Sequence, residues 1–171
     1  IVFNKTITPV SEAKKIFLNH WKQRVGPTKT IDWTPYYKKE FWKDNVVRIG
    51  LSAGFIEPLE STGLALAMEG AYQLLLALNG PGYTEHDRAI YNVVIKNFFE
   101  ESIDFIGSHY TLNSRSESFW RQARAQIKKS KTQLMYSKLL KDPTQSWGEG
   151  EAEWSFSFFS KKNWLTWLTQ Q

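Results

Sequence analysis

Two glutamates, Glu57 and Glu60, stand in a glycine-rich turn that runs directly into an apolar helical segment. The turn reads GLSAGFIEPLESTG. A helix N-terminus presents backbone N–H groups that have no acceptor inside the helix, and the helix dipole adds partial positive charge there. We therefore expect the amides near Ser61, Thr62 and Gly63 to suit a small anion, since glycine carries no side chain that would obstruct it.

The two carboxylates have two explanations at such a place. In the first, each carboxylate stabilises the helix start, as a partner for the helix dipole or as part of a cap. In the second, it is held in a closed site, where it moves a proton or orients a substrate. The spacing alone does not choose between them. The turn does not match GxGxxG, and the chain contains no dinucleotide-binding fingerprint.

The composition limits the classes of protein. With 171 residues, 42% of them hydrophobic, the chain is long enough for one domain with a core. The absence of cysteine excludes disulfides and thiolate metal sites, and we expect no metal. No apolar run is long enough for a bilayer and no signal peptide opens the chain, so we expect a cytoplasmic protein without a membrane partner.

The net charge of +5 is modest. Its main cluster consists of Arg121, Arg124, Lys128, Lys129 and Lys131. On a helix, such a cluster is usually a solvated face, and we do not expect nucleic acid as a partner.

Apolar periodicity predicts the elements around the turn. Strand composition marks Ile1–Asn4, Thr30–Tyr37 and Asn45–Ile49. Within the second of these, Pro35 favours an edge or a break. Helices are predicted from Thr8-Pro9 to Gly26-Pro27, from Ser61 to Leu78, from Thr84 to Tyr110, from Glu117 to Leu140, and, in a short last element, from an N-cap at Ser160. The start of the third helix, Thr84-Glu85-His86-Asp87, resembles a capping box with Asp in place of Glu. The second helix is apolar nearly all round, which predicts that it is buried.

The segment IGLSAGFIEPLESTGLAL closely resembles the signature of the flavin-dependent tryptophan halogenases. Further segments are similar to this family in the same order: IVFNKTITPVSEA, IDWTPYYKKEFWKDNVVRIGLSAGF, FFEESIDFIGSHYTLNSRSESFWR and FFSKKNWLTWLTQQ. The resemblance thus covers nearly the whole chain. Family members are much longer, and their GxGxxG turn, catalytic lysine and WxWxIP motif do not occur here. The chain is therefore expected to be the C-terminal portion of a halogenase.

The resemblance implies a mixed α/β fold that is mostly helical in this segment. It would be the C-terminal part of an FAD-dependent monooxygenase fold of the p-hydroxybenzoate hydroxylase type, joined to the helical substrate-side region of the halogenases. Residues 1–63 would form the end of the FAD-binding part, and residues 64–171 the helical substrate-side region. Both would belong to one larger enzyme. This chain alone would be inactive and would expose the apolar surface of Leu64–Leu78 that the missing part covers.

The resemblance also implies a chemistry. Reduced FAD from a separate flavin reductase, oxygen, and chloride or bromide yield hypohalous acid, which halogenates an electron-rich arene such as tryptophan or an indole. Glu60 and Ser61 would be catalytic, and Thr62 and Gly63 would bind the halide through their amides. The flavin side would consist of Gly50, Ala53, Gly54, Phe55, Pro58 and Leu59. The substrate side would consist of His109, Trp154, Phe158 and Trp164.

Alternatives remain at this point. His109 and the three aromatic residues of the substrate side would equally serve as packed core or lid residues. Leu51 stands where many family members have Asn, and the stretch from Trp120 to Trp164 is short, so an indole or another small arene is as plausible as free tryptophan. A hydroxylating flavoprotein monooxygenase and a non-enzymatic helical module are the competing functions. A homodimer is compatible with all of them.

Overall fold

The computed structural model describes residues 2–21, 26–80, 82–141, 158–159 and 161–169. These residues are mostly helical. The helices are α1 (Val10–Trp21), α2 (Thr62–Leu78), α3 (Glu85–Thr111), α4 (Ser118–Gln126), α5 (Lys131–Lys141) and α6 (Lys161–Leu168). The strands and 3₁₀ turns are β1 (Tyr36–Tyr37), β2 (Trp42–Lys43), β3 (Val46–Val47), η2 (Gly50–Ser52), β4 (Gly54–Phe55) and η3 (Leu59–Ser61).

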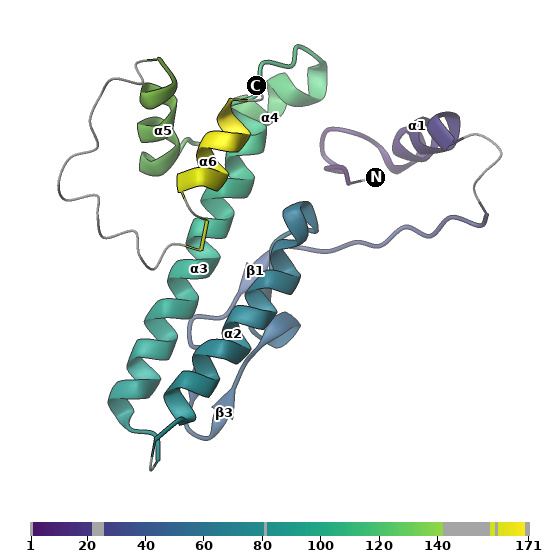
Figure 1. Ribbon diagram of the computed structural model, residues 1–171. Coiled ribbons are helices and arrows are strands. Elements are labelled where there is room, and N and C mark those ends of the chain that lie inside the picture. The colour runs from purple at the N-terminus through teal and green to yellow at the C-terminus, as the bar shows by residue number, and fades with distance from the viewer. Residues whose placement is uncertain (1, 22–25, 81, 142–157, 160, 170–171) are drawn as a thin grey trace.

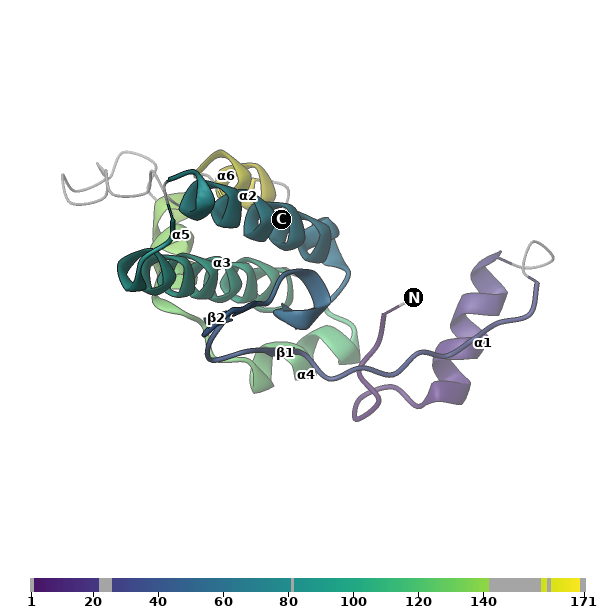
Figure 2. The same cartoon turned by 90° about the horizontal axis from the view of Figure 1, so that it is seen from below.

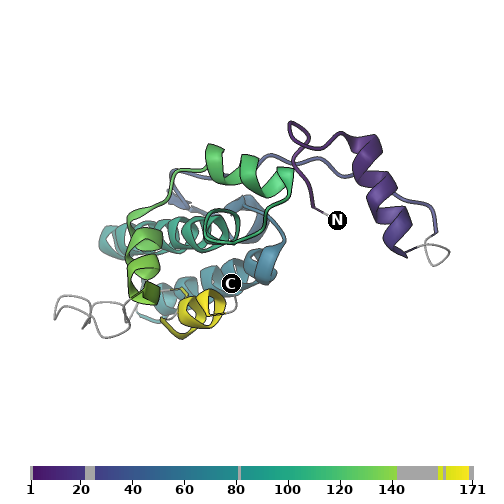
Figure 3. The ribbon, with the colours of Figure 1, turned by 90° about the horizontal axis from the view of Figure 1, so that it is seen from above.

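The long helices α2 and α3 form the body of the molecule. They lie side by side and are joined by a short connection, so they run antiparallel (Figure 1). The strands lie on one side of this pair, and helix α1 stands apart from the other helices in all three orientations (Figures 1, 2 and 3). The glycine-rich turn therefore connects the strand layer to the helical body.

The strands are shorter than the sequence predicts. β1 pairs antiparallel with β4, and β2 with β3, each over two residues. Residues 2–4 form no strand, so the prediction for Ile1–Asn4 is wrong over the residues described. Of Thr30–Tyr37 only the part after Pro35 pairs, as a break at proline predicts. A strand needs a partner, and residues 2–4 and 30–35 have none among the described segments.

The core lies where β1, β2 and α3 meet. The ring of Phe99 in α3 is 2% exposed and stacks on Tyr37 and Phe41, with centroid distances of 5.5 Å to each. Trp42 packs edge-on against Tyr91 at 5.6 Å. These aromatic contacts attach the segment before the glycine-rich turn to α3, and they fix where the turn begins.

Asn92 of α3 holds the same segment through its amide. Its Oδ1 accepts the backbone N–H groups of Phe41 at 2.6 Å and Trp42 at 2.9 Å. Its Nδ2 donates to the carbonyl oxygens of Trp42 at 2.9 Å and Arg88 at 3.0 Å. One side chain thus satisfies backbone groups that the short strands leave unpaired.

The capping box predicted at the start of α3 is confirmed. The hydroxyl of Thr84 accepts the N–H of Asp87 at 3.2 Å, and the carboxylate of Asp87 accepts the N–H of Thr84 at 2.8 Å. This reciprocal arrangement satisfies two donors at the helix start.

The single helix predicted from Glu117 to Leu140 is wrong, because it is divided into α4 and α5. Ile127 has φ −95° and ψ 119°, an extended conformation that ends α4. The hydroxyl of Ser130 then accepts the N–H of Gln133 at 3.1 Å, which is typical of an N-cap. Gln133 is 2% exposed and donates to the carbonyl oxygen of Asp104 in α3 at 2.7 Å. This anchorage and the serine cap together favour a new helix over a continuous one.

Helix α2 is buried on one side only, so it is not buried all round, and the exposed apolar surface expected for Leu64–Leu78 in this chain alone is confirmed. Thr62, Leu66 and Gly70 are buried. The exposed face carries Leu64, Met68, Tyr72, Leu75, Leu76 and Leu78, of which Leu75 is 67% exposed. Such a contiguous apolar face is typical of a surface that contacts another part of a protein. No helix among the described residues is both long enough and apolar enough to cross a membrane.

Candidate active site

The turn into α2 has an unusual backbone at the two residues expected to be catalytic. Glu60 has φ 54° and ψ 23°, and Ser61 has φ 54° and ψ 24°, so both lie in the left-handed region. This region is unfavourable for residues with a Cβ, at a typical cost of roughly 1–3 kcal/mol each. Such residues cluster at functional sites, where the surrounding structure maintains the strain. Both side chains are exposed.

The amide of Thr62 already has an acceptor. Its N–H and its hydroxyl both donate to the carbonyl oxygen of Leu59, the hydroxyl at 2.7 Å. Thr62 is 1% exposed. The expectation of an unpaired amide is therefore wrong for Thr62 in this conformation.

The next amide belongs to Gly63, which faces an aromatic ring. A Cβ at Gly63 would lie 3.9 Å from the ring of Phe55, in ordinary van der Waals contact. Halide binding by Thr62 and Gly63 stays a prediction, and it requires the N–H of Thr62 to turn away from Leu59.

His109 of α3 lies next to Glu60. Its Nε2 is 3.8 Å from Oε1 of Glu60, and its Nδ1 is 3.0 Å from the carbonyl oxygen of Phe105. The side chain of His109 is 11% exposed, whereas that of Glu60 is 55% exposed. Burial lowers the pKa of His109, and the Phe105 carbonyl and the Glu60 carboxylate oppose this shift only in part. The structure thus brings together two residues that are 49 positions apart, one expected to be catalytic and one expected on the substrate side.

The residues expected on the flavin side surround one turn but differ in access. Ala53 and Gly54 are buried against the protein itself, and the carbonyl oxygen of Ala53 accepts the N–H of Lys38 at 2.9 Å. Gly50 has φ 59°, which glycine adopts without strain. The remaining three, Phe55, Pro58 and Leu59, are exposed or partly exposed. Flavin contact remains a prediction for all six.

The aromatic residues of the substrate side pack along α3. Trp154 lies outside the described residues. Phe158 packs on Phe98 at 5.5 Å, and its N–H donates to the carboxylate of Glu101 at 2.7 Å. Trp164 is 2% exposed and meets the ring of Phe105 edge-on at 5.0 Å. Both described residues therefore have a packing role, and substrate contact stays a prediction.

Trp167 also lies at this site, although it is not among the residues expected from the sequence. Its ring stacks on the imidazole of His109, with centroids 3.7 Å apart and planes 18° apart. The signal was present, because Trp164 and Trp167 are three residues apart and share one face of α6. Helix α6 thus closes one side of the Glu60 and His109 pair.

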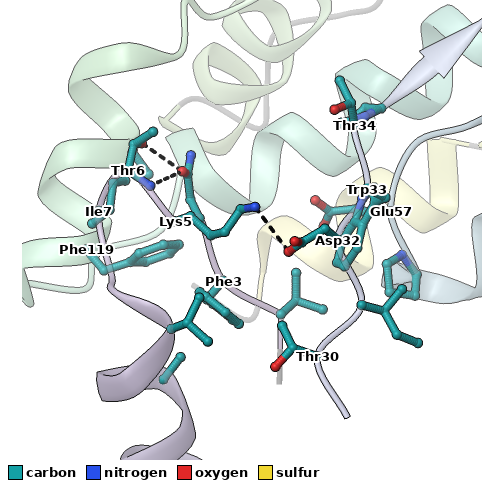
Figure 4. Close-up of a pocket in the computed structure, with 18 of the residues that line it drawn as sticks. Phe3, Lys5, Thr6, Ile7, Thr30, Asp32, Trp33, Thr34, Glu57 and Phe119 are labelled. Carbon is teal, nitrogen blue, oxygen red and sulfur yellow. Dashed lines mark hydrogen bonds and ion pairs between the residues drawn. The ribbon is translucent and has the colours of Figure 1, made fainter.

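Glu57, the other carboxylate of the turn, lines a cavity. This cavity has a volume of about 820 Å³ and lies between residues 2–17 and 28–35 on one side and the body of the molecule on the other. Figure 4 shows Glu57 and Trp33 on one side of it and Phe119 on the other. An ion pair between Lys5 and Asp32, with N and O 3.1 Å apart, lies at its wall.

The hydroxyl of Tyr110 donates to both oxygens of Glu57, at 2.9 and 3.1 Å. Burial raises the pKa of Glu57, and the hydrogen bond from Tyr110 lowers it by a smaller amount. Glu57 is therefore a structural partner of α3 rather than a neighbour of His109. No group of three or more histidine, aspartate or glutamate side chains in the described part of the chain is arranged to hold a metal ion.

The raised pKa of Glu57 predicts a pH-dependent effect of Glu57→Gln. A carboxyl whose pKa is higher in the folded state stabilises the fold at low pH, and this contribution is lost as pH rises through the folded pKa. Glutamine still accepts a hydrogen bond from Tyr110 but carries no charge. The stability of the variant relative to the parent should therefore increase between about pH 4 and pH 7.

Urea denaturation at the two pH values tests this prediction. The matched control is Glu117→Gln, which removes an exposed carboxylate. A Glu57 variant whose relative stability falls over this interval would contradict the direction of the pKa shift.

The chain is similar to known proteins both in sequence and in fold. The family model described as tryptophan halogenase matches residues 1–171. The chain is 34% identical over 128 residues to the tryptophan 7-halogenase KtzQ of Kutzneria sp. (strain 744), covering 72% of this chain and 24% of that protein.

Solved structures have the same fold. BrvH, a flavin-dependent halogenase from Brevundimonas sp. BAL3, matches with a TM-score of 0.76 and 28% identity over 96% of this chain and 32% of its own. The tryptophan 6-halogenase SttH from Streptomyces toxytricini matches with a TM-score of 0.77 over 98% of this chain and 33% of its own. At 20% identity, this second likeness supports the fold alone.

The chain thus spans between a fifth and a third of the length of the relatives it matches. Because the family model matches every residue, the chain belongs to the tryptophan halogenase family.

Proposed function

We propose that this chain is part of an FAD-dependent halogenase that uses reduced FAD, oxygen and chloride or bromide to halogenate an electron-rich arene such as tryptophan or an indole. The observation that carries the proposal is the exposed carboxylate of Glu60, held on a strained turn beside His109 in a chain of this family. The chain would be the C-terminal part of a fold of the p-hydroxybenzoate hydroxylase type, with residues 1–63 as the end of its FAD-binding part and residues 64–171 as the helical substrate-side region. A separate flavin reductase, a cytoplasmic location and a homodimer complete the proposal.

The described residues fit a flavin ring in one respect. Leu51 is 70% exposed and Leu64 is 66% exposed, so an apolar surface lies beside the turn. The backbone of Gly50 lies at this surface and close to α2, because a Cβ on Gly50 would be 3.5 Å from the Cβ of Ala67. Gly50, Leu51 and Pro58 would hold the ring. When bound, reduced FAD would supply the oxygen activation that is needed to oxidise halide to hypohalous acid.

The residues of this chain would act on what that chemistry delivers. Glu60 would orient the hypohalous acid or take the proton that leaves the arene when the carbon–halogen bond has formed. Ser61, also exposed, would be the polar neighbour that hydrogen-bonds to it. The apolar face of α2 that includes Met68 and Leu75 would be covered by the flavin-binding part of the enzyme.

Bromination by the full-length protein tests the proposal. The protein is incubated with reduced FAD, oxygen, bromide and a panel of indoles that includes tryptophan, and the products are analysed by mass spectrometry. The expected result is a product that carries bromine and does not form when FAD or bromide is omitted. An oxygenated product that is unaffected by bromide would favour the hydroxylating monooxygenase, which family membership does not favour.

A further inference from the structure

The tautomer of His109 follows from its hydrogen bond. Its Nδ1 lies 3.0 Å from the carbonyl oxygen of Phe105, one helical turn earlier in α3. A carbonyl oxygen only accepts, so Nδ1 carries the hydrogen and the neutral ring has its lone pair on Nε2. Among the described residues Nε2 has no hydrogen-bond partner, although it is buried. The nearest charged atom recorded for it is Oε1 of Glu60, at 3.8 Å.

The imidazole ring is fixed, whereas the carboxylate is free to move. Trp167 of α6 stacks on one face of His109 at 3.7 Å, and Phe105 meets the ring edge-on at 5.2 Å. The side chain of Glu60 is 55% exposed and is therefore free to rotate. A small rotation of this carboxyl would shorten 3.8 Å to hydrogen-bond distance, as catalytic contacts often do when substrate binds.

Two other carboxylates that contact or belong to α3 are already engaged. Glu57 receives the hydroxyl of Tyr110, and Glu101 receives the N–H of Phe158. Glu60 is the one charged side chain in the described part of the chain recorded as acting on the His109 ring. Burial lowers the pKa of His109, so the ring is neutral near pH 7 and its lone pair is available.

A carboxylate and an imidazole lone pair that face each other repel until one proton lies between them. The pair is thus arranged to take up one proton, and the halogenation in the proposed function releases one.

We propose that His109 is a positioning residue behind Glu60 that accepts the proton Glu60 removes from the halogenated arene. This inference rests on the proposed function. The C–H bond at the halogenated carbon breaks, its electron pair returns to the ring, and the proton binds a Glu60 oxygen. The O–H bond of the carboxylic acid then breaks as an N–H bond forms at Nε2, which leaves a carboxylate and an imidazolium. Trp167 holds the imidazole in the orientation that this transfer requires.

The test compares variants of the full-length protein in water and in deuterium oxide. His109→Gln keeps a polar group near Nε2 but takes up no proton. We expect its kcat to fall on the order of tenfold or more, and a solvent deuterium isotope effect on kcat to appear that the parent lacks, because loss of the acquired proton from Glu60 becomes rate-limiting. KM and flavin affinity should be unchanged. Trp167→Ala should change kcat and the isotope effect in the same direction.

The matched control is His86→Gln, an exposed histidine in the first turn of α3 that should behave as the parent. A His109→Gln enzyme with the parent's kcat and no isotope effect would overturn the inference while leaving the proposed function intact. A parent that does not brominate refutes the proposed function instead.

A second measurement does not depend on the folding of any variant of His109. Nitrogen NMR of the histidine-labelled parent reports the tautomer, and the His109 signal is identified by its change in Glu60→Gln. We expect the hydrogen on Nδ1 near pH 7.5, above the ordinary pKa of about 6.5. A hydrogen on Nε2 at that pH would remove the lone pair that faces Glu60 and would overturn the inference.

Discussion

Glu60→Gln should lower the halogenation rate of the full-length protein by about a hundredfold or more, the usual contribution of a general acid or base. Glutamine has nearly the same shape, so the strained turn from η3 into α2 should be retained. It cannot take a proton from the arene, and it cannot pass one to His109. Steady-state bromination measures the rate, which should fall. Flavin titration of the same preparation measures flavin affinity, which should stay that of the parent.

The control for this variant is Glu12→Gln, in the first turn of α1, where an exposed carboxylate is lost far from the turn. It should retain the parent's rate. If Glu60→Gln keeps the parent's rate as well, Glu60 has no role in the chemistry, and its left-handed backbone has to be explained by packing alone. If it instead loses flavin affinity, its role is in cofactor binding.

Local chemistry made much of the fold predictable. Thr84 and Asp87 specify the start of α3 by a reciprocal cap that needs no contact with another element. Pro35 limits β1 to the two residues that follow it, for the equally local reason that proline lacks an N–H. Both predictions depend only on residues that are neighbours in the chain, and the structure confirms both.

Features that depend on distant contacts were not predictable. The break at Ile127 depends on the attachment of Gln133 to α3, which periodicity does not report. The apolar pattern of α2 does not distinguish an exposed face from a buried one, so its exposure followed only from the expectation that the rest of a longer enzyme covers it. The proximity of Glu60 and His109 results from the packing of α2 against α3 and is not encoded in any motif of either segment.

The candidate site was predictable in its residue types and less so in its geometry. The resemblance to the family led to Glu60 and His109, but it did not indicate that Nε2 faces the carboxylate or that Trp167 covers the ring. The hydrogen bond from the Thr62 amide to Leu59 could not be predicted either, because a 3₁₀ turn and an α-helical start share the same sequence signals.

Gly54→Ala should produce the largest loss of stability among single methyl additions in the glycine-rich turn. A Cβ at this position would lie 2.6 Å from the carbonyl oxygen of Tyr36 and 2.7 Å from the ring of Phe99. The carbonyl belongs to the backbone of β1, and the ring is stacked in the core, so neither moves cheaply. We expect a loss of about 3 kcal/mol or more, at the upper end of overpacking effects.

The matched control is Gly80→Ala, where the nearest heavy atom to the new Cβ is 3.8 Å away, and the change in stability should be within about 0.5 kcal/mol. Thermal and urea unfolding of both variants beside the parent provide the comparison. The result also separates two reasons for glycine at position 54. If Gly54→Ala folds with the parent's stability but loses flavin affinity, the glycine serves the cofactor. If stability falls as expected, the close approach of β1, β4 and α3 already requires glycine at this position, and no contact with flavin is needed to explain it.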